Sequence, residues 1–443
     1  MHGMGTTPET QARIGEAVLR LDAWLDTMRA PDGYGGPVAH WWQDCLHFTG
    51  AGLDWRYEGI VIGYLNLYQC IGDERWLAKA RRAGDDLVRG QLPGGNFRNS
   101  SFELNPHLGG TPHEAACDLA LLHLTKALRE QEDNAWKRYA LAAARNLNAY
   151  HLGKLWHDEV QGFGNSPDNS TFTPNKSATI VEALFALAAL QQDEELVERY
   201  ALPTLDTILW HQVDAPGHRL DGAIDQSSLA GKKASRFFPF YNARCIPALL
   251  KGYECTQRER YLDAARRTIS FISRYRLPDG SFPQVIYGNG RVNRYPQWIA
   301  GVGDILRAMD LVSVAGRNGP GNDTLAWMLN GQHESGGVRT ARGFAAQVSQ
   351  KEPARLPEFR DVLPVCGWVD KAFRYLTSRV QDNLEPGNAT ISGTDLTCVF
   401  GNRIAKYRED ATAIELWQEG ELICRYRKAS AWAETCIPGG GTK

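Results

Sequence analysis

Long apolar runs and an excess of one charge are both missing from this sequence. No stretch reaches the roughly 18 consecutive apolar residues that a membrane-spanning helix needs. No charged segment followed by an apolar one stands at the N-terminus, so we expect neither a signal peptide nor a membrane partner. Lys and Arg number 49 and Asp and Glu 51, for a net charge of −2. Because a phosphate backbone needs a broad positive field, we also expect no nucleic-acid partner.

Disulfide and metal-binding patterns are also missing. The nine cysteines are scattered and none forms a Cys-x-x-Cys pair, which is typical of reduced thiols in a cytoplasmic protein. There is no His-Glu-x-x-His motif, and His40, Cys45 and His47 are too loosely spaced for a zinc site. We therefore expect a cytoplasmic protein with no metal and no cofactor.

An internal repeat is the strongest pattern that is present. A proline followed by a mostly apolar run recurs along the chain, and the first copy has arginine in its place. The spacings between successive copies are 56, 62, 65, 57 and 68 residues. Proline fits the first turn of a helix, where its missing N–H breaks no bond. The pattern therefore predicts six helix starts, near Arg56, Pro112, Pro174, Pro239, Pro296 and Pro364.

A second helix follows most of these starts. Residues 56–70 are apolar nearly all round, as in a helix buried on every side. Residues 75–89 and 259–275 place apolar side chains at steps of 3 and 4, which predicts helices with one wet face. The unit is therefore an inner helix paired with an outer one. The sixth inner helix has no following partner, but the amphipathic helix expected within residues 8–29 can fill that place and close a ring.

The predicted fold is all-α: an (α/α)6 toroid of six helical hairpins, with a small β-rich appendage at the C-terminus. We assign residues 1–380 to the toroid as a catalytic domain. Residues 381–443 form the appendage and tail, because runs of β-branched and aromatic residues there alternate with Gly and Asp. The sequence does not indicate an oligomeric state.

The links between hairpins indicate where a site would lie. Inner-to-outer links are short, whereas outer-to-inner links are long, and long ordered loops in a compact domain are usually functional. They converge on the N-terminal ends of the inner helices, where unpaired N–H groups favour negative charge. We therefore place the site in a cavity at that end of the ring.

Residues at these ends are the candidate substrate-binding groups. Aromatic faces suit the C–H faces of sugar rings, polar side chains suit hydroxyls, and arginine binds carboxylates with two parallel hydrogen bonds. The arginines favour an acidic substrate. The candidates are Trp42, Arg56, Asn175, Lys176, Asp221, Arg236, Asn242, Arg244, Arg294, Gln297 and Trp298.

Hairpin spacing, turns such as Pro278-Asp279-Gly280 and aromatic-rich loops such as Trp41-Trp42 carry a resemblance. Over residues 8–380 the chain resembles the six-hairpin toroid enzymes, among them glycoside hydrolases of the unsaturated glucuronyl hydrolase type and toroid polysaccharide lyases. The resemblance is architectural and implies the fold and a small-molecule or oligosaccharide substrate; no catalytic motif is carried over. Related toroids include terpene cyclases and protein prenyltransferases, and the Asp-x-Asp-Asp motif of the cyclases is absent here. The segment 332–337 weakly resembles a repeat of those enzymes.

The leading hypothesis is hydrolysis of a glycosidic bond in an acidic oligosaccharide. This reaction needs one protonated and one ionised carboxyl group, roughly 5 to 9.5 Å apart. Glu58 and Glu114 occupy corresponding positions on neighbouring inner helices, so either can be the general acid, with Asp54 as base or water-positioning group. The alternative for both glutamates is a capping role in the first helical turn.

Three further functions stay open. A lyase would remove the proton next to a uronic acid carboxylate with His113 and Tyr241. A terpene cyclase or prenyltransferase-like enzyme would use the aromatic side chains to stabilise a carbocation. A non-catalytic glycan-binding protein would need no carboxylate for turnover.

Overall fold

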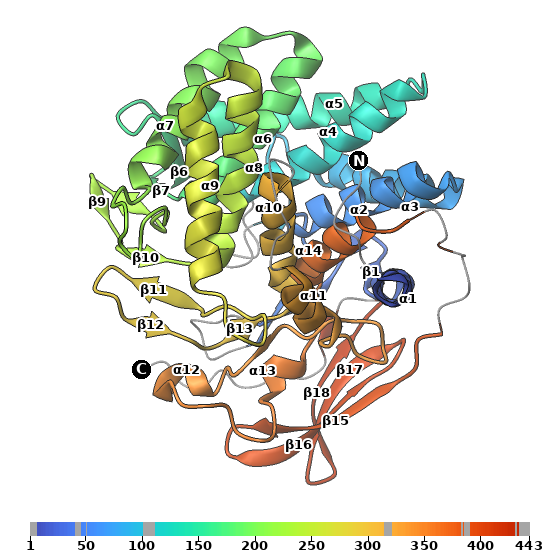
Figure 1. The fold of residues 1–443 in the computed structure, drawn as a ribbon. Coiled ribbons are helices and arrows are strands. Elements are labelled where there is room, and N and C mark those ends of the chain that lie inside the picture. The colour runs from blue at the N-terminus through green and yellow to red at the C-terminus, as the bar shows by residue number, and fades with distance from the viewer. Residues whose placement is uncertain are drawn as a thin grey trace.

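The computed structural model describes residues 7–39, 46–49, 51–100, 111–313, 321–381, 384, 390–429 and 432–433. Six inner helices contact one another in the closed order α2, α4, α6, α8, α10, α14 and back to α2. Figure 1 shows their hairpins arranged side by side. The bounds of the inner helices are α2 Arg56–Ile71, α4 Ala115–Glu130, α6 Pro174–Gln191, α8 Pro239–Thr256, α10 Gly303–Ser313 and α14 Cys366–Thr377.

Each inner helix contacts an outer helix of its own hairpin, in the pairs α14–α1, α2–α3, α4–α5, α6–α7, α8–α9 and α10–α11. The outer helices α3, α5, α7 and α9 also contact the inner helix of the next hairpin. The N-terminal helix thus supplies the missing partner of the sixth inner helix and closes the ring, as predicted. π-helical segments, Asn146–Leu155 and Leu196–Ala201, follow α5 and precede α7. The outer helices are α1 Pro8–Thr27, α3 Glu74–Gly90, α5 Trp136–Arg145, α7 Leu202–His211, α9 Glu259–Arg274 and α11 Gly321–Leu329.

Only some of the repeated prolines are the first residue of an inner helix. Pro174 and Pro239 are the first residues of α6 and α8, as predicted. The expectation of a helix beginning near Pro296 is wrong, because α10 begins only at Gly303. Residues Gln297 and Trp298 instead form a strand that pairs with Arg342 and Ala341. This pairing keeps the backbone extended and delays the helix.

The long outer-to-inner links form small antiparallel sheets at one end of the ring. One sheet has the order β5-β6-β7-β8-β9, another β10-β11-β12, and three more have two strands each. Two short helices, α12 Ala346–Ser349 and α13 Phe359–Val362, lie in the last link. The strands are β1 Arg29–Ala30, β2 Gly33–Tyr34, β3 Gly36–Ala39, β4 Leu46–Thr49, β5 Trp156–His157, β6 Gly162–Ser166, β7 Asn169–Phe172, β8 Ser228–Leu229, β9 Lys232–Lys233, β10 Arg236–Phe237, β11 Val285–Tyr287, β12 Val292–Asn293, β13 Gln297–Trp298 and β14 Ala341–Arg342.

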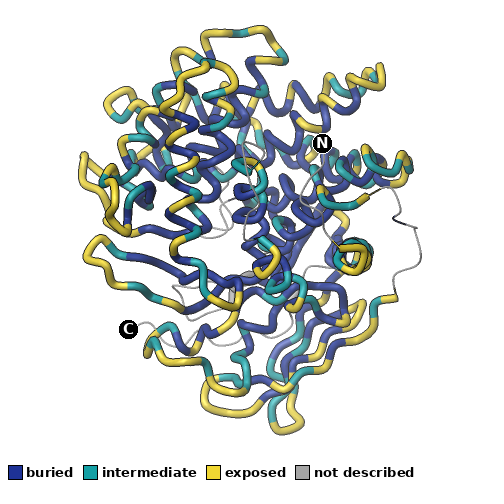
Figure 2. Tube along the Cα trace, viewed as in Figure 1, coloured by how far each residue is buried: buried dark blue, intermediate teal, exposed yellow. Residues whose placement is uncertain are grey.

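A five-stranded antiparallel sheet follows the last inner helix, at the lower edge of Figure 1. Figure 2 shows exposed residues along its outer side and buried residues in the helical ring. Its strands run in chain order: β15 Thr394–Phe400, β16 Arg403–Glu409, β17 Ala413–Gln418, β18 Glu421–Arg427 and β19 Trp432–Ala433. A turn at Gly401, which has a positive φ, separates β15 from β16. The division into two domains at residue 380 stays a prediction.

Glu409 ties this sheet to the helical ring. Its carboxylate is fully buried and accepts hydrogen bonds from Trp24 Nε1 at 2.6 Å and from Ser335 Oγ at 2.8 Å. The buried Lys428 ammonium lies 2.8 Å away. A buried charge with this many partners is stabilising only while all of them are present, so the sheet is fixed at one place on the ring.

Candidate active site

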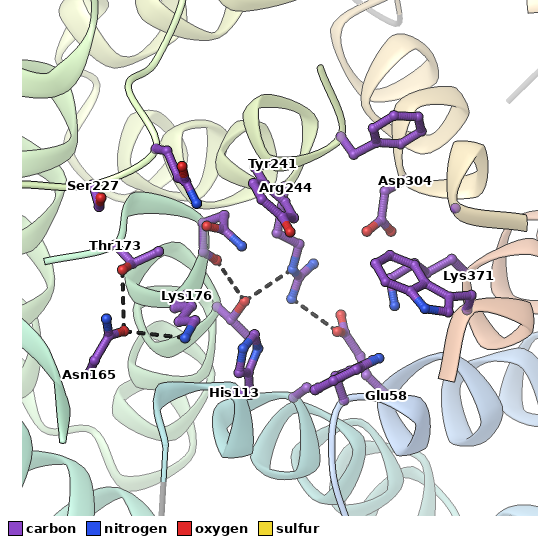
Figure 3. Close-up of a pocket in the computed structure, with 18 of the residues that line it drawn as sticks. Glu58, His113, Asn165, Thr173, Lys176, Ser227, Tyr241, Arg244, Asp304 and Lys371 are labelled. Atoms are coloured by element: carbon purple, nitrogen blue, oxygen red, sulfur yellow. Dashed lines mark hydrogen bonds and ion pairs between the residues drawn. The ribbon is translucent and has the colours of Figure 1, made fainter. Parts of the chain in front are cut away.

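A cavity of about 240 Å³ opens at the N-terminal ends of the inner helices, where the sequence predicts the site. All six inner helices, or the turns that lead into them, contribute side chains to its lining (Figure 3). Acidic, basic and aromatic groups meet there. From the helices come Trp55, Glu58, His113, Ala116, Asn175, Lys176, Thr179, Phe240, Tyr241, Arg244, Gly301, Asp304, Trp368 and Lys371.

The links between helices form one wall of the cavity. Asn165 in β6 accepts hydrogen bonds through Oδ1 from Thr173 Oγ1 at 3.2 Å and from Lys176 Nζ at 3.3 Å. Figure 3 shows these three side chains grouped on one side of the cavity. Thr171, Gln226 and Ser227 lie on the same wall. The amide of Asn165 therefore fixes the direction of the lysine ammonium group.

Two carboxylates line the cavity floor and share one arginine. Arg374 of α14 donates through Nη1 to Glu58 and through Nη2 to Asp304. Arg244 of α8 lies opposite and donates to Glu58 Oε2 at 3.0 Å. Burial alone would raise the pKa of Glu58, but Arg244 and Arg374 more than offset it and lower the pKa to about 2. Glu58 is therefore ionised throughout the physiological pH range.

Two glycines explain how these carboxylates come together. A Cβ on Gly59 would lie 2.3 Å from the carbonyl oxygen of Asp370, and one on Gly303 would lie 2.2 Å from that of Lys371. Only glycine lets α2 and α10 approach the backbone of α14 this closely. Glu58 precedes Gly59 and Asp304 follows Gly303, so the close approach brings both carboxylates within reach of Arg374.

Aromatic rings form the remaining side of the cavity. Trp55 donates through Nε1 to the carbonyl of Gly367 at 2.6 Å, and its ring lies 4.9 Å from that of His113. Trp368 stacks on Trp298, with the ring centroids 4.5 Å apart. Trp298 is 3% exposed and supports Trp368 from behind rather than lining the cavity. Offset stacking of this kind holds an indole ring in place.

The structure brings together six of the residues that the sequence singles out. All six line the cavity: Glu58, His113, Asn175, Lys176, Tyr241 and Arg244. Arg244, however, is already engaged, because Nε donates to Thr179 at 3.1 Å and its Nη groups contact Glu182 and Glu58. Through these contacts Arg244 supports the floor of the cavity.

The side chain of Glu114 points away from the cavity and does not line it. Its side chain is fully buried and accepts hydrogen bonds from Ser100 Oγ and from Asn146 Nδ2, the latter at 2.8 Å. Asp118, one turn along, is also fully buried, and burial together with Glu114 raises its pKa well above the usual range. This geometry suits a structural role for Glu114.

Asp54 and Arg56 bind each other and not the cavity. Asp54 Oδ1 accepts from Arg56 Nε at 2.8 Å and Oδ2 accepts from Nη2 at 3.0 Å, and both side chains are buried. Arg56 Nη1 also donates to the carbonyl of Tyr34. The pair fixes the start of α2 to the preceding link.

The other candidates lie in the walls or on the surface. Asn242 accepts from the backbone N–H of Ile224 through Oδ1 and donates to its carbonyl through Nδ2. Asp221 pairs with Arg267 at 2.7 Å. Gln297 is buried in β13. On the exposed side, Arg294 pairs with Glu352 at 3.2 Å, and Arg236 is solvent-exposed. Trp42 lies outside the described residues.

Sequence reasoning missed Asp304 and Lys371. Asp304 is the second residue of α10, and it was overlooked because the helix start was expected near Pro296. Lys371 lies one turn after Trp368 on α14, and that spacing was a usable signal. Asn165, Gln226 and Ser227 belong to links whose course no periodicity predicts.

Within the described ranges, no three His, Cys, Asp or Glu side chains are grouped so that they could hold a metal ion. None of the helices described is both long and apolar enough to cross a membrane.

Comparison of the sequence with family models and with curated proteins gives no match. Solved structures do match. A cellobiose 2-epimerase from Bacillus thermoamylovorans has a TM-score of 0.60 at 13% identity, covering 83% of this chain and 98% of its own. An unsaturated glucuronyl hydrolase specific for heparin has a TM-score of 0.58 at 13% identity, covering 84% and 96%.

An α-1,6-mannanase from a Salegentibacter species, solved with α-1,6-mannotetrose, has a TM-score of 0.54 at 13% identity, covering 84% of this chain and 99% of its own. Identities this low show similarity of fold alone. These structural matches, together with the closed order of inner helices, establish that the chain has the (α/α)6 toroid fold, with a C-terminal sheet added to it.

Proposed function

We propose that this protein is an enzyme that cleaves an acidic saccharide in the cavity, by β-elimination next to a uronic acid carboxylate. Similarity to a heparin-specific hydrolase and to a mannanase solved with its oligosaccharide supports a saccharide substrate. Lys176 lines the cavity, where Asn165 orients its ammonium group, and this supports an acidic one.

The protonation of the floor carboxylates carries the choice of reaction. Hydrolysis of a glycoside needs a protonated carboxyl group to donate to the leaving oxygen. Glu58 has a pKa of about 2 and Asp304 is bound by Arg374, so neither suits that role. His113 and Tyr241 line the same cavity and can both accept and donate a proton.

The elimination then proceeds as follows. His113 or Tyr241 takes the proton from C5, the C5–H electron pair forms a double bond between C4 and C5, and the C4–O bond breaks. The leaving oxygen takes a proton from the other of the two side chains. Asn175 and Lys176 line the cavity, and in this mechanism they bind the substrate carboxylate and stabilise the negative charge that develops on it.

Hydrolysis is the second candidate, because Glu58 and Asp304 line one cavity and several proteins of similar fold are glycoside hydrolases. It requires that one carboxyl gain a proton when the substrate binds.

A panel of uronate-rich oligosaccharides, read by near-ultraviolet absorbance and by release of reducing ends, tests the proposal. Elimination makes a C4–C5 double bond, so absorbance rises together with new reducing ends. New reducing ends without absorbance would favour hydrolysis. Loss of absorbance from oligosaccharides that already carry the double bond would also indicate a hydrolase. Binding without turnover would favour the glycan-binding alternative.

Variants at the two proton-transfer residues complete the test. Tyr241→Phe and His113→Gln are each expected to lower the rate by about 100- to 10,000-fold, the usual contribution of a general acid or base. Tyr253→Phe is the matched control, because Tyr253 lies near the far end of the same helix and donates to Glu259. Full activity in Tyr241→Phe and His113→Gln would contradict the elimination mechanism.

A further inference from the structure

Six charged side chains of alternating sign link five of the inner helices. The links are Asp304 to Arg374, Arg374 to Glu58, Glu58 to Arg244, Arg244 to Glu182, and Glu182 to Arg307. Arg307 lies on α10, three residues after Asp304, so the series returns to the helix from which it starts. We call this series the charge ring.

Only part of the charge ring reaches the cavity. Glu58, Asp304 and Arg244 line it, whereas Arg374 lies beneath with 5% of its surface exposed. Both Nη groups of Arg374 point to cavity carboxylates. Arg374 therefore influences a bound molecule through Glu58 and Asp304.

Two carboxylates at one site normally repel each other until one takes up a proton. Here each faces a guanidinium group, and the surroundings of Glu58 add further charges. Arg307 faces it from α10, Lys371 and Asp370 from α14, and His123 from α4. Both carboxylates accept from Arg374, and an ionised carboxylate is a pure hydrogen-bond acceptor. Sugar hydroxyl groups are the matching donors.

We propose that Arg374 is a positioning residue that holds Glu58 and Asp304 as a fixed pair of acceptors for the hydroxyl groups of the bound sugar. This inference rests on the proposed function only in taking the substrate to be a saccharide. It also orients the sugar: the hydroxyl edge lies on the α2, α10 and α14 side, and the acidic group lies toward Lys176 and Asn165 on the opposite wall.

Arg374→Gln, compared with Arg379→Gln, tests the inference. Arg379 follows α14 and pairs with Asp310 of α10 at 3.4 Å, so it offers the same kind of ion pair between the same elements, outside the cavity lining. Trp55 and Trp368 line the cavity, so intrinsic fluorescence reports saccharide binding without turnover. The probe is the uronate oligosaccharide that gives the strongest signal with the unaltered protein.

We expect Arg374→Gln to weaken binding and raise KM by about 10- to 100-fold, with a smaller change in kcat, because hydrogen bonds to charged groups are lost in the ground state. Binding should weaken further as the pH falls from 8 to 5, because Glu58 takes up a proton more readily once Arg374 no longer lowers its pKa. Arg379→Gln should stay within about 2-fold of the unaltered protein at every pH. Equal affinities and equal pH profiles for the two variants would overturn the inference.

A double variant keeps the test decisive where Arg374→Gln fails to fold. Arg374→Gln with Asp304→Asn removes one charge of each sign, so it should recover thermal stability while binding stays weak. Recovery of both would overturn the positioning role. The proposed function fails separately, when the unaltered protein binds a saccharide of the panel but does not cleave it, and the fluorescence comparison of the two arginine variants then still tests the inference.

Discussion

Glu58 and Glu114 stand at corresponding positions on neighbouring inner helices, yet they belong to different environments. Both side chains are buried. Glu58 faces the cavity and is held ionised between Arg244 and Arg374. Glu114 faces away from it, toward Ser100 and Asn146, beside Asp118, whose pKa burial and Glu114 raise well above its usual range. Burial and position in the repeat therefore do not decide which carboxylate belongs to the site.

Local helix geometry explains the difference. Glu58 lies in the first α-helical turn of α2, whereas Glu114 ends a 3-10 turn, Pro112–Glu114, before α4 begins. A 3-10 turn advances about 20° more per residue than an α-helix, or roughly 60° over three residues. His113, and not Glu114, consequently lines the cavity.

The largest effect that would sharpen this comparison is expected from Glu58→Gln. The amide keeps the shape of the side chain but removes the charge that both arginines bind, and we expect kcat/KM for the acidic saccharide to fall by about 100-fold or more. Steady-state kinetics measure the loss, and circular dichroism checks the fold. An unchanged kcat/KM would remove Glu58 from the site.

Glu114→Gln should do the reverse. Its amide oxygen can accept from Asn146 while its NH₂ donates to Ser100 Oγ, so only the extra strength of a charged acceptor is lost and the free energy of unfolding should fall by about 1 kcal/mol. Activity should stay within about 3-fold. Urea denaturation and the kinetic assay together decide this, and a large loss of kcat at unchanged stability would return Glu114 to the catalytic candidates.

A pH effect distinguishes the buried groups His151 and Asp118, near Glu114, from the ion-paired carboxylates of the cavity floor. Burial lowers the pKa of His151, which lies 3.5 Å from Asp118, to about 3. Below pH 6.5 the unfolded chain binds a proton at this histidine that the folded protein does not, so the contribution of His151 to stability falls as the pH falls toward 3, by up to about 1.4 kcal/mol per pH unit. Asp118, whose pKa is raised, contributes with the opposite sign. His151→Gln should remove this part of the slope between pH 6.5 and 5 in urea titrations. The exposed His218→Gln is the control and should keep the slope of the unaltered protein.

The smallest effect is expected from Arg294→Gln. Arg294 is paired with Glu352 on the surface, 47% of its side chain is exposed, and such pairs contribute about 0 to 1 kcal/mol. Neither KM for an acidic saccharide nor the melting temperature should change measurably. A raised KM for acidic substrates alone would show that the cavity extends to this link.

The repeat predicted the hairpins because buried and half-buried helices leave a clear periodicity. Residues 56–70 and 259–275 were expected to be helical, and α2 and α9 match them closely. The N-terminal helix was assigned to α14 because a ring must close. These features depend on local pattern and on counting, which a single sequence supplies.

The site was only partly predictable, because side-chain direction depends on where each helix begins. The strand at Gln297 and Trp298 delays α10, and this moved Asp304 out of the expected set. Arg56 and Arg244 carry the same charge, yet one binds Asp54 within its own turn and the other reaches Glu58 across the ring. No periodicity distinguishes a local partner from a distant one.

The close approach of α2 and α10 to α14 at Gly59 and Gly303 controls how readily the floor carboxylates take up a proton. A methyl group at either position would meet the backbone of α14 at 2.2 to 2.3 Å, so the helix would have to move outward. Arg374 would then reach one carboxylate less well, and that carboxylate would hold its proton more strongly. An uncharged substitution one residue away from a floor carboxylate would thus set which groups on the floor are acids and, with that, which reactions the toroid can perform.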